Sequence, residues 1–148
     1  MPLHPPVTIL VIDDEPSFVR ALAALLRRDG YAVDTADNGS RALSQLEEHP
    51  YDVLLCDLRM PELDGSTFYN ILTSQYPHLR QRVIFLTGDT LSGESQQFLE
   101  QCGQLWVPKP CHATEIRSAI AQVLHNATKD MAKNNFPDCL SCSILATE

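Results

Sequence analysis

The chain has 148 residues, a formal net charge of −8 and five cysteines. Its length fits one domain that buries enough apolar surface to fold without disulfides or a structural metal. The acidic balance disfavours direct binding to nucleic acid or insertion into an anionic membrane. Because the sequence shows neither a signal peptide nor an apolar run near the ~20 residues of a membrane span, we expect a cytoplasmic location with reduced thiols.

Apolar runs and amphipathic patterns alternate along the chain after a Pro-rich leader at residues 1–7. Short apolar runs predict strands, and apolar spacing with a period of 3.6 residues predicts helices. Gly30 and Pro50 mark the expected ends of the first two helices. The expected strands cover residues 8–12, 31–36, 53–56, 82–87 and 105–107, and the expected helices cover residues 15–29, 38–48, 64–75, 92–102 and 113–125.

This alternation predicts the α/β class, with a doubly wound parallel sheet that carries helices on both faces. The flavodoxin-like (βα)5 arrangement with strand order 2-1-3-4-5 is the common solution for five strands, although the alternation by itself does not fix the order. We expect residues 8–125 to form this domain and residues 126–148 to be a C-terminal tail or linker.

Polar side chains stand where the predicted strands end. Asp13 and Asp14 follow the first strand, Asp57 the third, Thr87 closes the fourth, and Lys109 lies just beyond the fifth. In the order 2-1-3-4-5 these strands are consecutive neighbours, so their carboxyl ends converge at one edge of the sheet. For Asp57 taken alone, a simple turn-capping role is an equally good interpretation.

Three clustered carboxylates repel one another, at a cost of about 4 kcal/mol for a pair of charges 4 Å apart at an effective dielectric near 20. A divalent cation offsets this repulsion, and an all-oxygen ligand set favours Mg²⁺ completed by a phosphate. The Lys109 ammonium and the Thr87 hydroxyl suit phosphoryl oxygens. A carboxylate can attack phosphorus to form an acyl phosphate, which gives the cluster a nucleophile.

The ordered set Asp13-Asp14, Asp57, Thr87 and Lys109-Pro110 resembles the response regulator receiver domain, the phospho-acceptor module of two-component signalling. The resemblance covers residues 8–125. It implies that Asp57 is the phosphorylated residue and that Thr87 and Lys109 contact the phosphoryl group.

The same resemblance implies the metal ligands, a backbone feature and the role of the protein. Asp13, Asp14, Asp57 and the backbone carbonyl of Arg59 would hold Mg²⁺, and the bond before Pro110 would be cis. A receiver domain is not an enzyme in the ordinary sense, because it catalyses only its own phosphorylation and dephosphorylation.

The resemblance also implies partners. The phosphoryl donor would be a histidine kinase or a phosphotransfer protein, and the output face would be the fourth helix, fifth strand and fifth helix, which is also a possible homodimer surface. We expect output through a downstream protein effector, since no DNA-binding segment follows. A stand-alone regulator and a receiver from a hybrid sensor kinase both fit, and the resemblance of residues 82–89 to hybrid-kinase receivers favours the second.

Three further residues occupy positions that tune or report phosphorylation in this family. Trp106 stands three residues before Lys109, where a switching aromatic is usual, and a fixed surface aromatic is the alternative interpretation. Arg59 and Asp89 follow Asp57 and Thr87 by two residues and would flank the phosphoryl group. The alternative for this pair is two solvated surface charges, which contribute little.

Two other functions are open to a flavodoxin-like fold with these residues. A Mg²⁺-dependent phosphatase with an aspartyl-phosphate intermediate needs a second acid two residues after the nucleophile, and Arg59 occupies that position. A nucleotide-binding protein needs a Gly-rich loop after the first strand, which is missing. In the tail, Cys139 and Cys142 form a CxxC without a second ligand pair, so we expect an inert tail.

Overall fold

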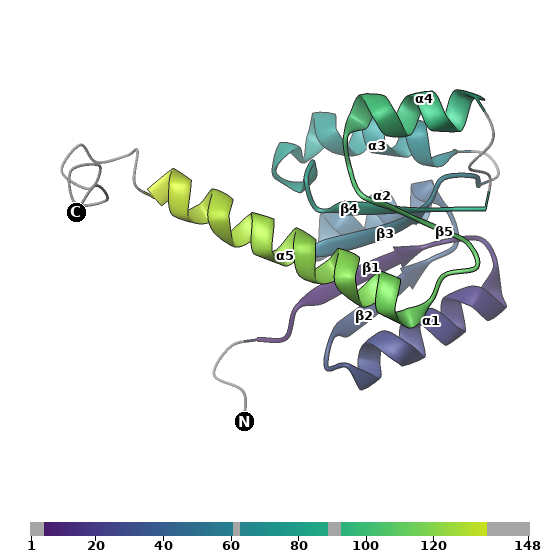
Figure 1. Ribbon diagram of the computed structural model, residues 1–148, viewed down its shortest axis with the longest axis horizontal. Coiled ribbons are helices and arrows are strands. Elements are labelled where there is room, and N and C mark those ends of the chain that lie inside the picture. The colour runs from purple at the N-terminus through teal and green to yellow at the C-terminus, as the bar shows by residue number, and fades with distance from the viewer. Residues whose placement is uncertain (1–4, 61–62, 89–92, 136–148) are drawn as a thin grey trace.

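The computed structural model describes residues 5–60, 63–88 and 93–135, with side chains to residue 127. A five-stranded parallel sheet runs in the order β2-β1-β3-β4-β5, which confirms the predicted fold class and strand order (Figure 1). The strands are β1 (Thr8–Ile12), β2 (Ala32–Ala36), β3 (Val53–Asp57), β4 (Val83–Thr87) and β5 (Trp106–Pro108). The helices are α1 (Pro16–Arg28), α2 (Gly39–Glu48), α3 (Gly65–Gln75), α4 (Gly93–Cys102) and α5 (Ala113–Asn135), with a 3-10 turn, η1 (Pro77–Leu79).

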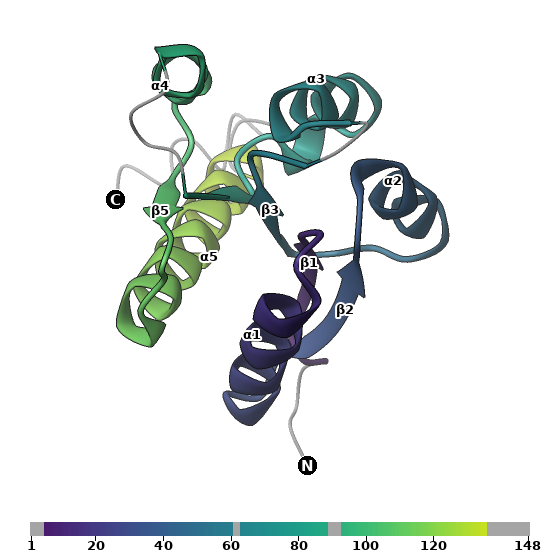
Figure 2. The same ribbon diagram turned by 90° about the vertical axis from the view of Figure 1, so that its right-hand side faces the viewer.

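Two cores lie on opposite faces of the sheet, because successive side chains of a strand point to opposite sides. In β1, Leu10 and Ile12 pack with α2, α3 and α4, while Ile9 and Val11 pack with α1 and α5. Figure 2 shows the same division, with α1 and α5 on one side of the strands and α2, α3 and α4 on the other. Both faces are therefore apolar, which leaves the edges of the sheet for polar chemistry.

Local side-chain chemistry sets the helix boundaries beside the sheet. The Asn38 carboxamide oxygen accepts the backbone N–H of Arg41 at 2.8 Å, and an Asp64 carboxylate oxygen accepts that of Thr67 at 2.9 Å. Both are N-caps, which satisfy backbone donors in the first helical turn. Gly30 ends α1 with φ of +98°, a left-handed conformation that glycine adopts without strain.

The last helix is longer than the sequence pattern predicted. We expected it to end near His125, but α5 continues to Asn135, and Figure 1 shows this extension running beyond the sheet. Residues 126–135 contain neither Gly nor Pro, and the first breaker is Pro137, which disfavours helix at the residue before it. The prediction of an end at His125 was wrong because a loss of apolar periodicity does not end a helix where no Gly or Pro interrupts the chain.

The remaining differences are small. The fifth strand lies one residue later than predicted, and η1 was not predicted. Ser92, expected to begin the fourth helix, lies outside the described residues, as do Cys139 and Cys142 of the tail. Among the described residues, no helix combines the length and the apolar content that crossing a membrane requires.

Candidate functional site

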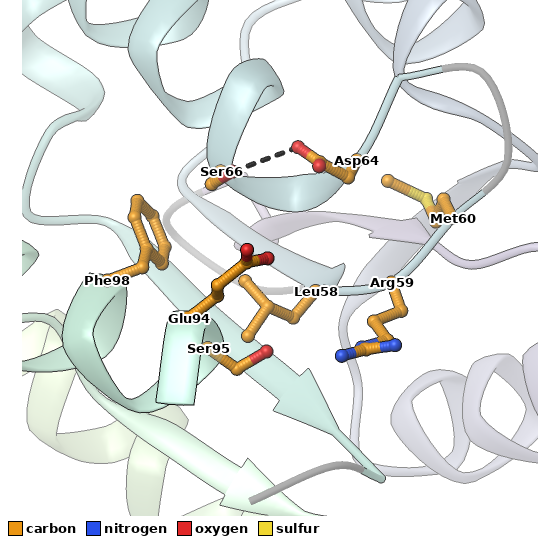
Figure 3. Close-up of a pocket in the computed structure, with 8 residues that line it drawn as sticks. All are labelled: Leu58, Arg59, Met60, Asp64, Ser66, Glu94, Ser95 and Phe98. Atoms are coloured by element: carbon orange, nitrogen blue, oxygen red, sulfur yellow. Dashed lines mark hydrogen bonds between the residues drawn. The ribbon is translucent and has the colours of Figure 1, made fainter. Parts of the chain in front are cut away.

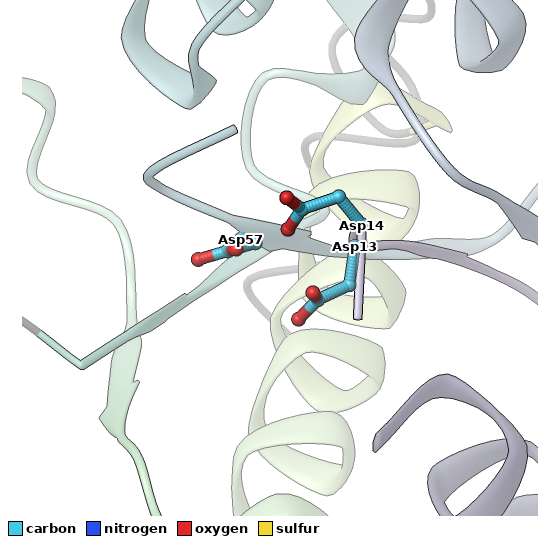
Figure 4. Close-up of side chains that lie close together, drawn as sticks. All are labelled: Asp13, Asp14 and Asp57. Atoms are coloured by element: carbon cyan, nitrogen blue, oxygen red, sulfur yellow. The ribbon is translucent and has the colours of Figure 1, made fainter. Parts of the chain in front are cut away.

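The candidate site lies at the carboxyl edge of the sheet, where the ends of β1 and β3 are adjacent. Asp13 follows β1 directly, and Asp57 is the last residue of β3, which pairs with β1 in parallel. Asp14 projects from the same chain turn as Asp13, and Figure 4 shows all three carboxylates gathered at this edge. Each offers an oxygen, and these oxygens lie within 4.8 Å of one another. The predicted convergence of three acids is therefore present.

Lys109, which directly follows the outermost strand β5, completes the cluster. Its backbone N–H donates to the Thr87 carbonyl at 2.8 Å, which extends the pairing of β4 with β5 past the strand end. Its ammonium Nζ donates to Asp13 Oδ2 at 2.7 Å and lies 3.6 Å from Asp57 Oδ2. The side chain of Lys109 is only 18% exposed, so this ammonium is largely removed from water and held by carboxylates.

Burial and charge determine the protonation of the site. Burial raises the pKa of Asp57 to about 6, with repulsion from Asp13 adding to the shift and attraction to Lys109 opposing it. For Lys109, burial alone would lower the pKa, but the hydrogen bond to Asp13 and the charge of Asp57 raise it above its usual value. The ammonium is therefore charged at neutral pH, and Asp57 ionises there at a cost.

The donor set fits a divalent cation bound by oxygen. Asp13 and Asp57 are buried, and Asp14 is exposed at the mouth. Three ionised carboxylates with one ammonium leave two formal negative charges in a partly desolvated cluster. A hard divalent cation of the Mg²⁺ type, which keeps some waters and uses few carboxylates, matches this arrangement.

Three further residues predicted from the sequence, Thr87, Pro110 and Trp106, lie on or just after β4 and β5. Thr87 is buried at the end of β4, next to β5. The Lys109–Pro110 peptide bond is cis. Trp106 on β5 pairs in register with Phe85 of β4, and it is 44% exposed, so part of it lies on the surface.

Arg59 lies on the rim of the site, beside a cavity of about 530 Å³. Its backbone N–H donates to Asp57 Oδ1 at 3.3 Å, which fixes the loop leaving β3. Its exposed side chain extends toward the start of α4 (Figure 3). Asp89, the predicted partner of Arg59, lies outside the described residues. The cavity is lined by Leu58, Arg59, Met60, Asp64, Ser66, Glu94, Ser95 and Phe98.

One residue of the site was not identified from the sequence. Phe18, in the first turn of α1, places its ring centroid 4.5 Å from the Lys109 ammonium. In the helix predicted for residues 15–29, the apolar spacing of Phe18 indicates only a core position. Its location four residues after Asp14 was the available signal, because α1 begins at the same edge of the sheet.

Comparisons with known proteins agree with the geometry. The family model described as the response regulator receiver domain matches residues 9–121. The transcriptional regulatory protein KdpE of Mycobacterium tuberculosis is 35% identical over 120 residues, which are 81% of this chain and 52% of that protein. The signal transduction histidine-protein kinase BarA of Shigella flexneri is 27% identical over 115 residues, 77% of this chain and 12% of that protein. The chain spans about half the length of KdpE and a small part of BarA.

A solved structure shares the fold. The CheY-like receiver domain protein of Methanospirillum hungatei superposes with a TM-score of 0.78, at 22% identity, over 85% of this chain and 99% of that one. None of these matches supports the phosphatase alternative. Since the family model covers most of the chain and the strand order is the predicted one, the chain belongs to the response regulator receiver domain family and is a receiver domain of two-component systems.

Proposed function

We propose that Asp57 accepts a phosphoryl group from the phosphohistidine of a histidine kinase or a phosphotransfer protein. The observation that carries this proposal is the cluster at the carboxyl edge. Three carboxylate oxygens lie within 4.8 Å of one another, and the Lys109 ammonium lies 2.7 Å from Asp13 and 3.6 Å from Asp57. A buried acid beside an acidic pair suited to bind a metal, and close to an ammonium, is suited to act as a nucleophile toward phosphorus.

In the proposed reaction, a carboxylate oxygen of Asp57 attacks phosphorus in line with the leaving imidazole nitrogen. A P–O bond to Asp57 forms as the P–N bond breaks, and the departing imidazole keeps the bonding electron pair. Lys109 stabilises negative charge on the phosphoryl oxygens, and the Thr87 hydroxyl donates a hydrogen bond to one of them. Burial of Asp57 lowers the access of water to the resulting acyl phosphate.

Asp13, Asp14, Asp57 and the backbone carbonyl of Arg59 are the proposed ligands of Mg²⁺. When bound, the ion would supply positive charge to the phosphoryl oxygens. The side chains of the pair Arg59 and Asp89 are proposed to tune hydrolysis at the mouth of the site. The exposed guanidinium of Arg59 is placed on that rim.

We propose that phosphorylation switches protein contacts on the face formed by α4, β5 and α5. Trp106 on β5 is the proposed reporter, with a side chain exposed on that face. A downstream effector protein, or a second copy of the chain, would bind there. We assign residues 8–125 to the receiver and propose a cytoplasmic location. The output signal would pass through protein contacts, without direct binding to nucleic acid.

The parent protein is a separate proposal. The names of the two relatives describe a transcriptional regulatory protein and a histidine kinase, so receivers similar to this one occur in both contexts. The resemblance of residues 82–89 to hybrid-kinase receivers leads us to propose a hybrid sensor kinase as the parent, with a stand-alone regulator as the second candidate.

Intact-mass spectrometry tests the phosphoacceptor directly. We expect wild-type protein incubated with acetyl phosphate and Mg²⁺ to gain one phosphoryl mass, and both Asp57→Asn protein and wild-type protein in EDTA to remain unmodified. Lys109→Ala should slow the gain. Equal labelling of wild type and Asp57→Asn would contradict the assignment, and steady turnover of p-nitrophenyl phosphate would favour a phosphatase.

A further inference from the structure

We propose that Phe18 is a positioning residue for phosphoryl transfer, because the face of its ring holds the Lys109 ammonium at the carboxylate rim. The inference rests on the proposed function and deepens it. It assigns a role to an apolar side chain that is not one of the three clustered carboxylates.

The geometry places the Lys109 ammonium close to two carboxylates and to an aromatic ring. Nζ of Lys109 lies 2.7 Å from Asp13 Oδ2, 3.6 Å from Asp57 Oδ2 and 4.5 Å from the Phe18 ring centroid. An aromatic face carries partial negative charge and attracts a cation within about 6 Å of its centroid. The ring therefore contributes attraction to Nζ in addition to that of the two carboxylates.

The ring is expected to restrict the ammonium because the lysine side chain is flexible. Its ammonium is a point charge on a four-carbon stem with several rotatable bonds, so one hydrogen bond to Asp13 does not fix its direction. A second, apolar attachment narrows the positions that Nζ can occupy. The attraction is also strengthened because the Lys109 side chain is only 18% exposed, and desolvation increases cation–π energies.

The start of α1 explains why position 18 faces the lysine. Pro16 is the first residue of the helix, directly after the acidic segment, and its fixed φ suits that position. Phe18 therefore lies in the first turn, at the carboxyl edge of the sheet and not in the middle of the helix packing. It is half-buried and packs against the core formed by α1, α5 and the sheet.

That packing is the competing explanation, because a large apolar side chain at this position would stabilise the fold whatever its electronic character. Leucine retains most of the apolar contact but has no ring face. Tyrosine retains the ring face and adds a hydroxyl at a half-exposed site. Comparing Phe18→Leu with Phe18→Tyr therefore separates positioning of the ammonium from packing.

The experiment measures the initial rate of phosphorylation by acetyl phosphate with Mg²⁺, using intact mass, for the full chain. We expect Phe18→Leu to lower the rate about three- to tenfold and Phe18→Tyr to stay within about twofold of wild type. The matched control is Val19→Ala, which removes apolar contact with the same core from the adjacent helix position. It should leave the rate within about twofold.

A double-mutant cycle with Lys109→Ala gives the decisive readout. If Phe18 acts through the ammonium, adding Phe18→Leu to Lys109→Ala should lower the rate no further. A purely structural role would lower it again by the same factor. The affinity for beryllofluoride in the presence of Mg²⁺, read by ¹⁹F NMR, should follow the same pattern without depending on turnover.

The outcomes separate the two proposals. Labelling of the wild type at Asp57 together with an unchanged rate in Phe18→Leu would overturn the positioning role and leave the proposed function standing. An equal loss of phosphorylation rate in Phe18→Leu and Phe18→Tyr would also overturn the positioning role, as would additive losses of rate in the double-mutant cycle. Failure to label the wild type at Asp57 would refute the proposed function itself, and the role of Phe18 with it.

Discussion

The two edges of the same sheet hold acidic side chains in different ways: Asp52 at the amino edge is partly exposed, whereas Asp13 and Asp57 at the carboxyl edge are buried. At the amino edge, Asp52 Oδ2 accepts the backbone N–H of Thr8 at 2.9 Å and its hydroxyl at 3.2 Å. Arg82 donates to the Asp52 carbonyl at 3.1 Å. At the carboxyl edge, burial and repulsion from Asp13 raise the pKa of Asp57 to about 6.

The two edges differ in how far neighbouring groups compensate the charge of the acidic side chains. The amino-edge carboxylate has fixed donors from its own protein, so it ties β1 to the start of β3 and contributes to stability. At the carboxyl edge, among the described residues, three clustered acids lie beside the Lys109 ammonium, so part of their negative charge remains uncompensated. That uncompensated charge lowers stability, and in the proposed function a cation would offset it, which is the trade-off expected at a functional site.

The largest effect is expected where the carboxyl edge is most crowded. A Cβ built on Gly65 would lie 2.8 Å from both the Asp57 carbonyl oxygen and the Leu58 Cα, which are backbone atoms. Gly65→Ala should therefore displace the loop that leaves β3, lower the free energy of unfolding by about 1–3 kcal/mol and slow phosphorylation of Asp57. Urea denaturation and the acetyl phosphate assay measure the two effects.

The matched control is Gly93→Ala, at the first residue of α4, where an added Cβ meets nothing within 4 Å. We expect this variant to be as stable as wild type or slightly more stable, because alanine loses less backbone entropy on folding. Equal destabilisation by the two substitutions would show that crowding against Asp57 and Leu58 is not the cause.

The next effect tests the uncompensated charge itself. In EDTA at pH 8, Asp57→Asn should raise the free energy of unfolding by about 1–3 kcal/mol, because it removes an ionised, buried carboxylate from beside Asp13. Because the folded pKa lies above the unfolded value, the contribution of Asp57 is most favourable below about pH 4 and is lost as the pH rises through about 6.

The pH series supplies the control for this prediction. In EDTA, the free energy of unfolding of the wild type should decline relative to that of Asp57→Asn as the pH rises from about 4 through about 6. Mg²⁺ should stabilise the wild type more than the variant. A gain for Asp57→Asn that is the same at pH 4 and pH 8 would contradict an electrostatic origin.

The smallest effect is expected at the amino edge, with the opposite sign. Asp52→Ala removes the acceptor of the Thr8 N–H and hydroxyl, so it should lower the free energy of unfolding by about 1 kcal/mol. The rate of Asp57 phosphorylation should not change, because Asp52 directly precedes β3 and Asp57 is its last residue, at the opposite end of the strand. A slower phosphorylation rate in this variant would show that the edges are coupled.

Much of the carboxyl edge was predictable because it depends on strand ends. Apolar runs locate the strands, and parallel strands bring their carboxyl ends to one edge, so Asp13, Asp57 and Lys109 were assigned to one site from their positions alone. The N-caps Asn38 and Asp64 are likewise local, since each accepts an N–H three residues later.

The same local information failed where the signal was weak. The sequence predicted an end near His125 because apolar spacing fades there, whereas α5 continues to Asn135 in the absence of a helix breaker. The 3-10 turn η1 has three residues, too few for periodicity to reveal.

The order of elements, the identity of the acids and their common edge therefore follow from the amino-acid pattern, because they depend on periods of two and 3.6 residues and on strand direction. The pairing of Lys109 with Asp13 across 96 positions of sequence, and the place of its ammonium over the ring of Phe18, depend on how distant segments pack together. An apolar pattern shows which face of a helix is buried. Which charge that face meets depends on how α1, β1 and β5 are placed together.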